Sequence, residues 1–245
     1  MRVIVLVLTA LAISCHAFED DLYLHGPVQI ETFETGKLVG FLEKVKEWLK
    51  TGHEKPDIPV LDPFKKDHFE LAITNEVITL KGTLDDLRAT GLSDYDVLQG
   101  DFELAGLKAK IKLIWPDIDL MTKYHLTEAK LGDDLKLWGT GNIMALVQGL
   151  AVDVNISISM DDDGKLYVKD LDVKIALKSL KFDASGLLDD DQTSKMLSKI
   201  VTELAPQILV DYQNDVSKLA GDLVRKVMDE MLGKLSIGDI IGMIS

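Results

Sequence analysis

The spacing of hydrophobic and polar residues changes twice along the chain. Apolar residues recur every three or four positions over residues 38–49 and again after residue 189, which is typical of amphipathic helices. Between Phe69 and Phe182 the period is two, which is typical of antiparallel strands with one wet face. This order differs from the alternating strands and helices of a parallel sheet. The sequence therefore predicts an α+β fold.

The clearest strand pattern covers residues 150–161, where apolar residues alternate strictly with polar or small ones. A second alternating run, residues 166–177, follows Asp163-Gly164, a pair that suits a tight hairpin turn. Its alternation slips once between Val168 and Leu171. Such a slip predicts a β-bulge, and a bulge adds curvature to the sheet.

A broad apolar stripe predicts a long helix near the C-terminal end. Residues Asp189–Asp191 suit its cap and its acidic first turn. Pro206 fits either a kink or the first turn of a second helix. From there the stripe continues to Gly233, which predicts a rod of about 28 residues and roughly 42 Å.

The first 17 residues have the pattern of a secretory signal peptide. Arg2 precedes an apolar run over residues 3–13, and small residues lead to Ala17. The alternative is a membrane anchor, but the run is shorter than the roughly 20 apolar residues that span a bilayer. We therefore expect cleavage after Ala17, secretion, and a single extracellular domain over residues 18–245. Cleavage also removes Cys15, the only cysteine, so the mature chain has neither disulfides nor thiol chemistry.

The charge balance is strongly acidic. The chain has 27 basic and 41 acidic residues, and its formal net charge is −14. Removal of Arg2 with the signal peptide makes the mature chain one charge more negative. Such a surface repels polyanions, so we expect no binding of nucleic acid or anionic head groups. No later segment has the length and apolar character for stable membrane insertion.

Motifs of hydrolases and metalloproteases are absent from the sequence. The segment around Ser93 lacks the second glycine of a nucleophile elbow. The histidines are isolated in sequence, and an isolated histidine is more often a surface residue than a metal ligand. The sequence therefore predicts a protein that is not an enzyme and has no metal and no cofactor.

Two segments resemble ligand-binding loops but fit a structural role better. Gly139-Thr140-Gly141 lacks the third glycine and the βαβ context of a nucleotide loop, so we interpret it as a strand bend. Residues 159–170 have acidic spacing similar to that of a calcium loop. Their flanks alternate as strands and no terminal glutamate follows, so we interpret them as a solvated hairpin turn.

Asn155-Ile156-Ser157 is a sequon for N-glycosylation. Asn155 lies on the polar face of its predicted strand, which allows access to the modifying enzyme. The alternative is an unmodified asparagine, because sequons inside strands are often unused.

Four short segments resemble the takeout and juvenile-hormone-binding proteins of insects. Residues 58–64, IPVLDPF, are similar to a signature near the start of these proteins. The other three are a strand-ending segment, a glycine pair and a turn, found at residues 115–124, 137–141 and 163–167. Residues 69–93 also resemble the opening of the group 7 mite allergens.

Both groups are branches of the tubular lipid-binding superfamily, the BPI-like or TULIP proteins. The resemblance implies a long, highly curved antiparallel sheet wrapped around a long C-terminal helix, with a short N-terminal helix. It also implies an arthropod carrier of hydrophobic ligands and no catalytic residues. The mature chain departs from the takeout pattern because it lacks the N-terminal cysteine pair.

The plentiful apolar surface leaves a filled core and an elongated apolar cavity as alternatives. In the second case the protein is a carrier for an apolar small molecule or lipid, such as a juvenile hormone, a terpenoid or a fatty acid. The other hypothesis is a surface-active or innate-immunity protein, allergen-like, with the same fold and no enclosed ligand. The phase of the pattern gives these candidate lining residues: Leu71, Ile73, Ile111, Leu113, Trp115, Val152, Val154, Ile156, Ile158, Val173, Ile175, Leu219, Leu223 and Val227.

Overall fold

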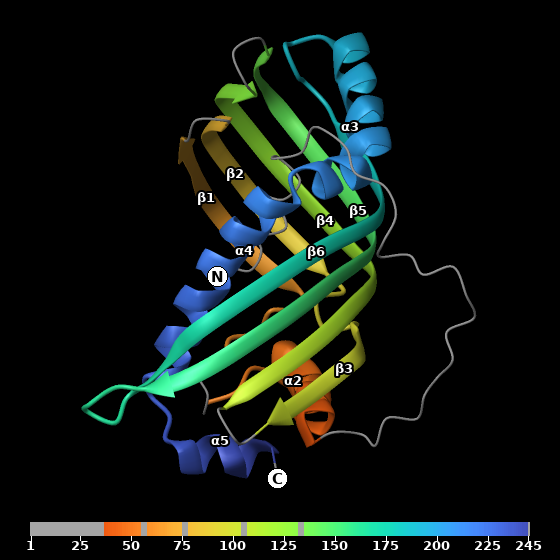
Figure 1. Cartoon of the computed structure of the whole chain (residues 1–245). Helices are drawn as coiled ribbons and strands as arrows, with labels where there is room; N and C mark the ends of the chain where they lie inside the picture. Colours follow the sequence, from red (N-terminus) through yellow and green to blue (C-terminus); the bar gives the residue numbers. More distant parts are fainter. Residues whose placement is uncertain (1–36, 55–57, 75–77, 104–106, 132–134, 245) are drawn as a thin grey trace.

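The computed structural model describes residues 37–54, 58–74, 78–103, 107–131 and 135–244 (Figure 1). Within these residues, the helix α2 (Lys37–Thr51) precedes the sheet. Three helices follow it: α3 (Asp191–Asp211), α4 (Gln213–Leu232) and α5 (Ile237–Ile244). The predicted order of helix, strands and helix is confirmed. The predicted signal peptide lies outside the described residues.

The strands form one antiparallel sheet that curves along its length (Figure 1). They are β1 (Phe64–Thr74), β2 (Ile78–Thr90), β3 (Asp96–Glu103), β4 (Lys108–Leu131), β5 (Leu135–Met160) and β6 (Leu166–Ala184). Their order is β1-β2-β4-β5-β6, and β3 pairs with β4 beyond the end of β2. The long strands β4 and β5 therefore connect both ends of the molecule.

The hairpin between β5 and β6 agrees with the sequence pattern. Gly164, in the turn, has φ +81°, a left-handed conformation that favours glycine. The pairing register shifts between Ser157 and Ile158 of β5, opposite residues 168–170 of β6. This is the predicted bulge.

The predicted 28-residue rod is wrong, because the helical segment breaks at Tyr212 into α3 and α4. Pro206 lies inside α3, so it does not begin the second helix. The helix α3 packs on the end of β6 near Ala184, whereas α4 bonds to the start of β6 near Val168. Because β6 curves between these points, one straight helix does not follow it. The predicted ends are confirmed: Asp190 caps α3, and Gly233 is the C-cap of α4.

Side chains of α3 cover the free edge at the end of β6 and the segment that follows it. Three hydroxyl groups each accept a hydrogen bond from the N–H of one residue and donate one to its carbonyl oxygen. The pairs are Ser194 with Leu187, Ser198 with Ala184 and Thr202 with Phe182. An exposed strand edge is a template for aggregation, so this arrangement protects the end of an open sheet.

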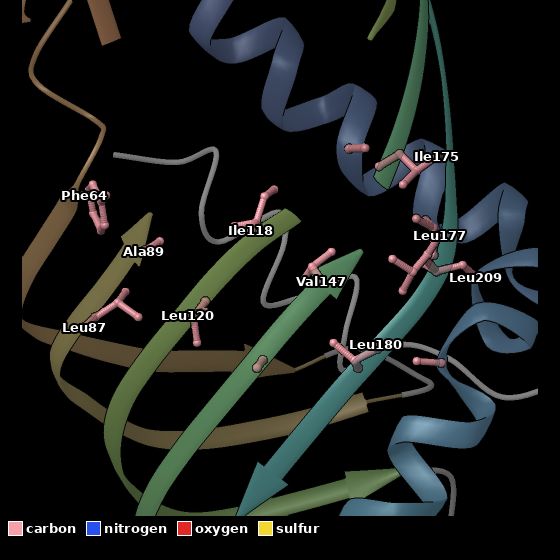
Figure 2. Close-up of a cluster of buried hydrophobic side chains, with 14 of the residues drawn as sticks. Phe64, Leu87, Ala89, Ile118, Leu120, Val147, Ile175, Leu177, Leu180 and Leu209 are labelled. Carbon is pink, nitrogen blue, oxygen red and sulfur yellow. The ribbon is translucent and has the colours of Figure 1, made fainter. Parts of the chain in front are cut away.

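Buried apolar side chains form clusters on the inner face of the sheet. The largest lies between the sheet and the helices α3 and α4, as Figure 2 shows, and includes Phe64, Leu87, Ile118, Leu120, Val147, Leu180 and Leu209. A second cluster joins the ends of β5 and β6 to α2 and α5, and includes Leu38, Leu42, Ile156, Leu166, Leu232 and Ile240. A third includes Leu84, Tyr124, Ala184 and Leu187.

Candidate functional site

A band of apolar side chains lies on the inner face of the sheet between the two larger clusters. Directly opposite residues of an antiparallel sheet point to the same face, and the register places them in rows across β4, β5 and β6. The rows are Trp115–Leu150–Leu177, Leu113–Val152–Ile175 and Ile111–Val154–Val173. We call the partly buried residues here the apolar band: Ile111, Leu113, Trp115, Leu150, Val152, Val154 and Leu171.

Burial is greatest at the β6 end of each row. Val173 and Ile175 of β6, where α4 packs, are only 2% and 7% exposed. Their row partners on β5 and β4 are half-buried, although all are apolar. Val154 and Leu171 contact both larger clusters, so the band is continuous with the interior at both ends. The inner face therefore keeps accessible apolar surface that α4 does not cover.

Half of the predicted lining residues, seven of fourteen, lie together at this place. Ile111, Leu113, Trp115, Val152 and Val154 belong to the apolar band, and Val173 and Ile175 complete its rows. Ile156 and Ile158 are buried in the second cluster, while Leu219 of α4 packs against the largest cluster.

The remaining predicted lining residues are Leu71, Ile73, Leu223 and Val227. Leu71 packs against the third cluster, whose residues include Tyr124 and Leu187, so the structure does not bring it to the band. The side chains of Ile73, Leu223 and Val227 are outside the described part of the chain, and their role stays a prediction. The prediction missed Leu150 and Leu171 of the band, although both follow the alternation of the strand pattern.

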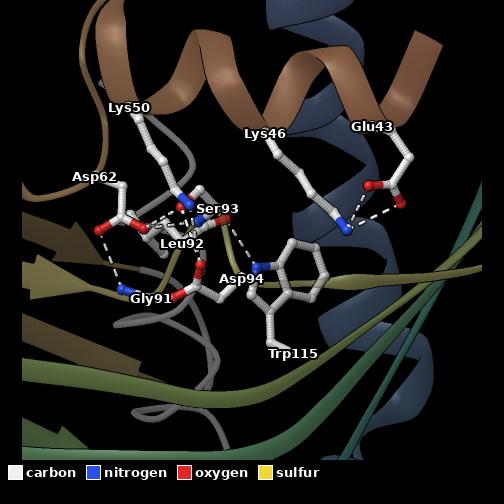
Figure 3. A network of polar contacts seen from close by, with 9 residues as sticks. All are labelled: Glu43, Lys46, Lys50, Asp62, Gly91, Leu92, Ser93, Asp94 and Trp115. Atoms are coloured by element: carbon white, nitrogen blue, oxygen red, sulfur yellow. Dashed lines mark hydrogen bonds and ion pairs between the residues drawn. The ribbon is translucent and has the colours of Figure 1, made fainter. Parts of the chain in front are cut away.

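Trp115 ends the band and is held in place by a polar contact (Figure 3). Its Nε1–H donates to the carbonyl oxygen of Leu92 at 2.9 Å. The ring of Tyr95 lies 5.2 Å from the Trp115 ring, centroid to centroid, and the Tyr95 hydroxyl donates to Leu42 of α2. Burial, and to a lesser degree the Glu43 carboxylate, raises the pKa of Tyr95, so this phenol stays a neutral donor.

Asp62 holds the turn that carries Leu92. Its Oδ1 accepts from the N–H of Gly91 at 3.1 Å, and its Oδ2 accepts from the N–H and the hydroxyl of Ser93 at 2.9 and 2.5 Å (Figure 3). Ser93 is 1% exposed. Ser93, considered above as a nucleophile, therefore serves as a buried donor to Asp62.

The two loop-like segments have the structural roles that the sequence predicts. Gly139 lies in β5 with φ +147°, and a Cβ there would lie 2.1 Å from the carbonyl oxygen of Gly186. The Asp161 carboxylate accepts from the N–H groups of Asp163 and Lys165, so the hydrogen bonds of this hairpin turn are made within the turn.

Asn155 lies within β5, half-buried, opposite Lys110 and Asp172 on the neighbouring strands. Its glycosylation stays a prediction. In the part of the chain that the structure describes, no helix is long and apolar enough to cross a bilayer.

An open, curved antiparallel sheet with helices packed on its apolar face defines the architecture and the site. The family model for haemolymph juvenile hormone binding proteins (JHBP) matches residues 12–242, almost the whole sequence. The chain belongs to this family. The resemblance to takeout and juvenile-hormone-binding proteins is thereby confirmed, while that to the group 7 mite allergens stays a prediction.

Solved structures show the same fold. The chain is similar to Takeout 1 of Epiphyas postvittana, with a TM-score of 0.58 and 15% identity over 82% of this chain and 92% of that one. It also matches a lipopolysaccharide binding protein at 14% identity over 80% of this chain and 40% of that chain. The TM-score of that match is 0.38. No curated protein matches the sequence.

Proposed function

We propose that the protein is a secreted carrier, without catalytic activity, that binds a hydrophobic small molecule or lipid against the apolar band. The observation that carries this proposal is that burial is greatest at the β6 end of rows that are apolar throughout. Apolar surface left accessible on an inner face favours a ligand, because each 100 Å² that a ligand covers contributes about 2.5 kcal/mol. Membership of a family named for juvenile hormone binding supports the same function.

The band also restricts the chemistry of the ligand. Its side chains are hydrocarbon apart from the Trp115 indole, and the indole N–H already donates to Leu92. The ligand segment beside the band is therefore apolar, as in a juvenile hormone, a terpenoid or a fatty acid. Contact area rather than polar pairing supplies the affinity there.

Extraction of the purified protein with organic solvent, followed by mass spectrometry, tests the proposal. We expect a co-purifying apolar molecule, and uptake of a fluorescent fatty acid by the emptied protein. Val154→Trp fills the band and should abolish uptake, whereas Met144→Trp, at an exposed position of the same strand, should not. Absence of both a co-purifying molecule and uptake in the unaltered protein would overturn the carrier function.

Secretion and processing form part of the proposal. The pattern of residues 1–17 supports cleavage after Ala17 and a single domain over residues 18–245. Expression in insect cells should release a protein whose N-terminal sequence begins at Phe18. A loss of mass on treatment with an N-glycosidase, absent from Asn155→Gln, would show that Asn155 carries a glycan.

A surface-active protein is the second candidate, and an apolar stripe on α3 favours it. Met196, Ile200 and Leu204 recur at four-residue spacing and are each at least 40% exposed. Side chains at this spacing share one helix face, so the stripe is a continuous exposed surface. Surface-tension measurements test this function: the unaltered protein should lower surface tension, and Ile200→Glu should weaken the effect.

A further inference from the structure

A chain of hydrogen bonds connects Asp62, outside the apolar band, to Trp115 within it (Figure 3). We propose that Asp62 is a positioning residue for ligand binding: its carboxylate fixes the turn at residues 91–93, and this turn fixes the Trp115 indole as one side of the band. This inference rests on the proposed function, which it deepens by naming a residue that controls the ligand site from a distance.

The first link joins Asp62 to the turn. Three donors of Gly91 and Ser93 converge on its two oxygens, and the Ser93 side chain is buried. A carboxylate offers only acceptors, so it suits three donors. An asparagine has one acceptor oxygen, and its NH₂ group would face an N–H donor. Asp62→Asn therefore disturbs the turn while it nearly preserves the volume of the side chain.

The second link joins the turn to the indole. The Leu92 carbonyl oxygen lies between the two residues that Asp62 binds, and it accepts from Trp115 Nε1–H. Tyr95, two residues after Ser93, packs against the Trp115 ring with the two ring planes at 60°. The hydrogen bond of the indole N–H and the tilted aromatic contact together restrict both rotatable bonds of the tryptophan side chain.

The same turn also provides a matched control. Asp94 follows Ser93 directly, and its side chain is 63% exposed and 3.5 Å from Lys50. An exposed ion pair of this kind contributes little to stability. Asp94 Oδ1 lies 3.5 Å from the Ser93 hydroxyl, whereas Asp62 Oδ2 lies 2.5 Å from it. Asp94→Asn therefore removes the same charge one residue from Ser93 and leaves the close acceptor of the turn in place.

The first measurement is spectroscopic and needs no ligand. The chain has three tryptophans, so Trp48→Phe together with Trp138→Phe leaves Trp115 as the single emitter. In this background Asp62→Asn should shift the Trp115 emission to longer wavelength and increase its quenching by acrylamide. Asp94→Asn should change neither. Unchanged emission in a folded Asp62→Asn variant would overturn the positioning role.

The second measurement is uptake of a fluorescent fatty acid. Asp62→Asn should weaken uptake about tenfold, as expected for the loss of a charge-assisted contact, and Asp94→Asn should not. In a Trp115→Leu background, Asp62→Asn should have no further effect, because the residue through which Asp62 acts is missing. An equal loss in both backgrounds would show that Asp62 acts through general stability, and would overturn the proposal.

The failure of this inference can be distinguished from the failure of the carrier function. If the unaltered protein takes up no fatty acid and co-purifies with no apolar molecule, the carrier function and the role in binding both fail. The Trp115 emission then still decides whether Asp62 positions the indole. If Asp62→Asn does not fold, Ser93→Ala removes only the hydroxyl donor and should shift emission and uptake in the same direction by a smaller amount.

Discussion

Asp229 of α4 accepts a hydrogen bond from the backbone N–H of Val168 at 2.7 Å. One turn earlier, Arg225 donates to the carbonyl oxygen of the same residue at 2.5 Å. The two side chains together replace the missing strand partner of Val168 on the free edge of β6. With the hydroxyl groups of Ser198 and Thr202 of α3, they anchor both helices to the edge strand by its backbone. The helices thereby hold their place over the apolar face of an open sheet.

Asp229→Ala should loosen the contact between α4 and the start of β6. Val168 is 2% exposed, so its N–H would be left unsatisfied in a buried place, at a cost of about 1–3 kcal/mol. The Val168 amide should exchange with deuterium faster than in the unaltered protein. Asp222→Ala, at an exposed position of the same helix, should leave this exchange unchanged. Equal exchange at Val168 in both variants would contradict the anchoring role.

Ser198→Ala should destabilise the contact of α3 with the other end of β6. The Ser198 hydroxyl accepts from the N–H of Ala184 at 2.9 Å, and both residues are buried. Its removal leaves a buried donor without a partner, so the free energy of unfolding should fall by about 1–3 kcal/mol in urea titrations. Lys199→Ala changes the next, exposed residue and should alter it by less than about 0.5 kcal/mol. Similar effects of Ser198→Ala and Lys199→Ala on the free energy of unfolding would contradict the role of Ser198 at the edge of β6.

Strand periodicity predicted the inner face of the sheet well, because burial on one side leaves a period of two in the sequence. Leu113 and Val152 lie on the predicted face for this reason. Periodicity does not record position along a strand, so it predicts Leu71 in the same lining set as Leu113, although Leu71 packs near α3. The break at Tyr212 interrupts no apolar stripe. It follows from the curvature of β6, which is a property of the whole sheet.

The periodic pattern of the sequence also gives no indication of the role of Asp62. Its partners Gly91 and Ser93 lie about 30 residues further along the chain, and only the fold brings them together. The family resemblance marked the segment that contains Asp62 but gave no function to the carboxylate. A contact of this kind becomes visible only in three dimensions.

Two glycine substitutions should have opposite effects. A Cβ at Gly141 would lie 2.0 Å from the carbonyl oxygen of Ser185, a backbone atom with little freedom to move. Gly141→Ala should therefore destabilise the protein by about 1–3 kcal/mol or more, as overpacking does. Gly40 lies in α2, and a Cβ there would meet no atom within 4 Å, so Gly40→Ala should stabilise by about 0.5–1 kcal/mol. The midpoint of thermal unfolding should be lower in Gly141→Ala and higher in Gly40→Ala than in the unaltered protein. A similar midpoint in the two variants would contradict the close approach at Gly141.

Glu128 should contribute to the pH dependence of stability in acid. Hydrogen bonds from Lys130 and Lys81 lower the pKa of Glu128 to about 2. Because the pKa is lower in the folded than in the unfolded chain, this contribution is present above about pH 4.3 and is lost as the pH falls towards 2. Urea titrations between pH 6 and pH 2 give the free energy of unfolding at each pH. This free energy should fall less steeply with decreasing pH in Glu128→Gln than in the unaltered protein.

The two lysines provide an independent check on this acid dependence. Lys81 lies on β2 and Lys130 on β4, and both bind the Glu128 carboxylate from strands that pair with each other. Replacement of both lysines by methionine should make the free energy of unfolding fall less steeply between pH 6 and pH 2, as Glu128→Gln does. High salt should weaken the effect in the unaltered protein, because the three side chains are partly exposed and their charges are screened. If the free energy of unfolding falls as steeply with decreasing pH in Glu128→Gln as in the unaltered protein, other carboxylates control the stability in acid.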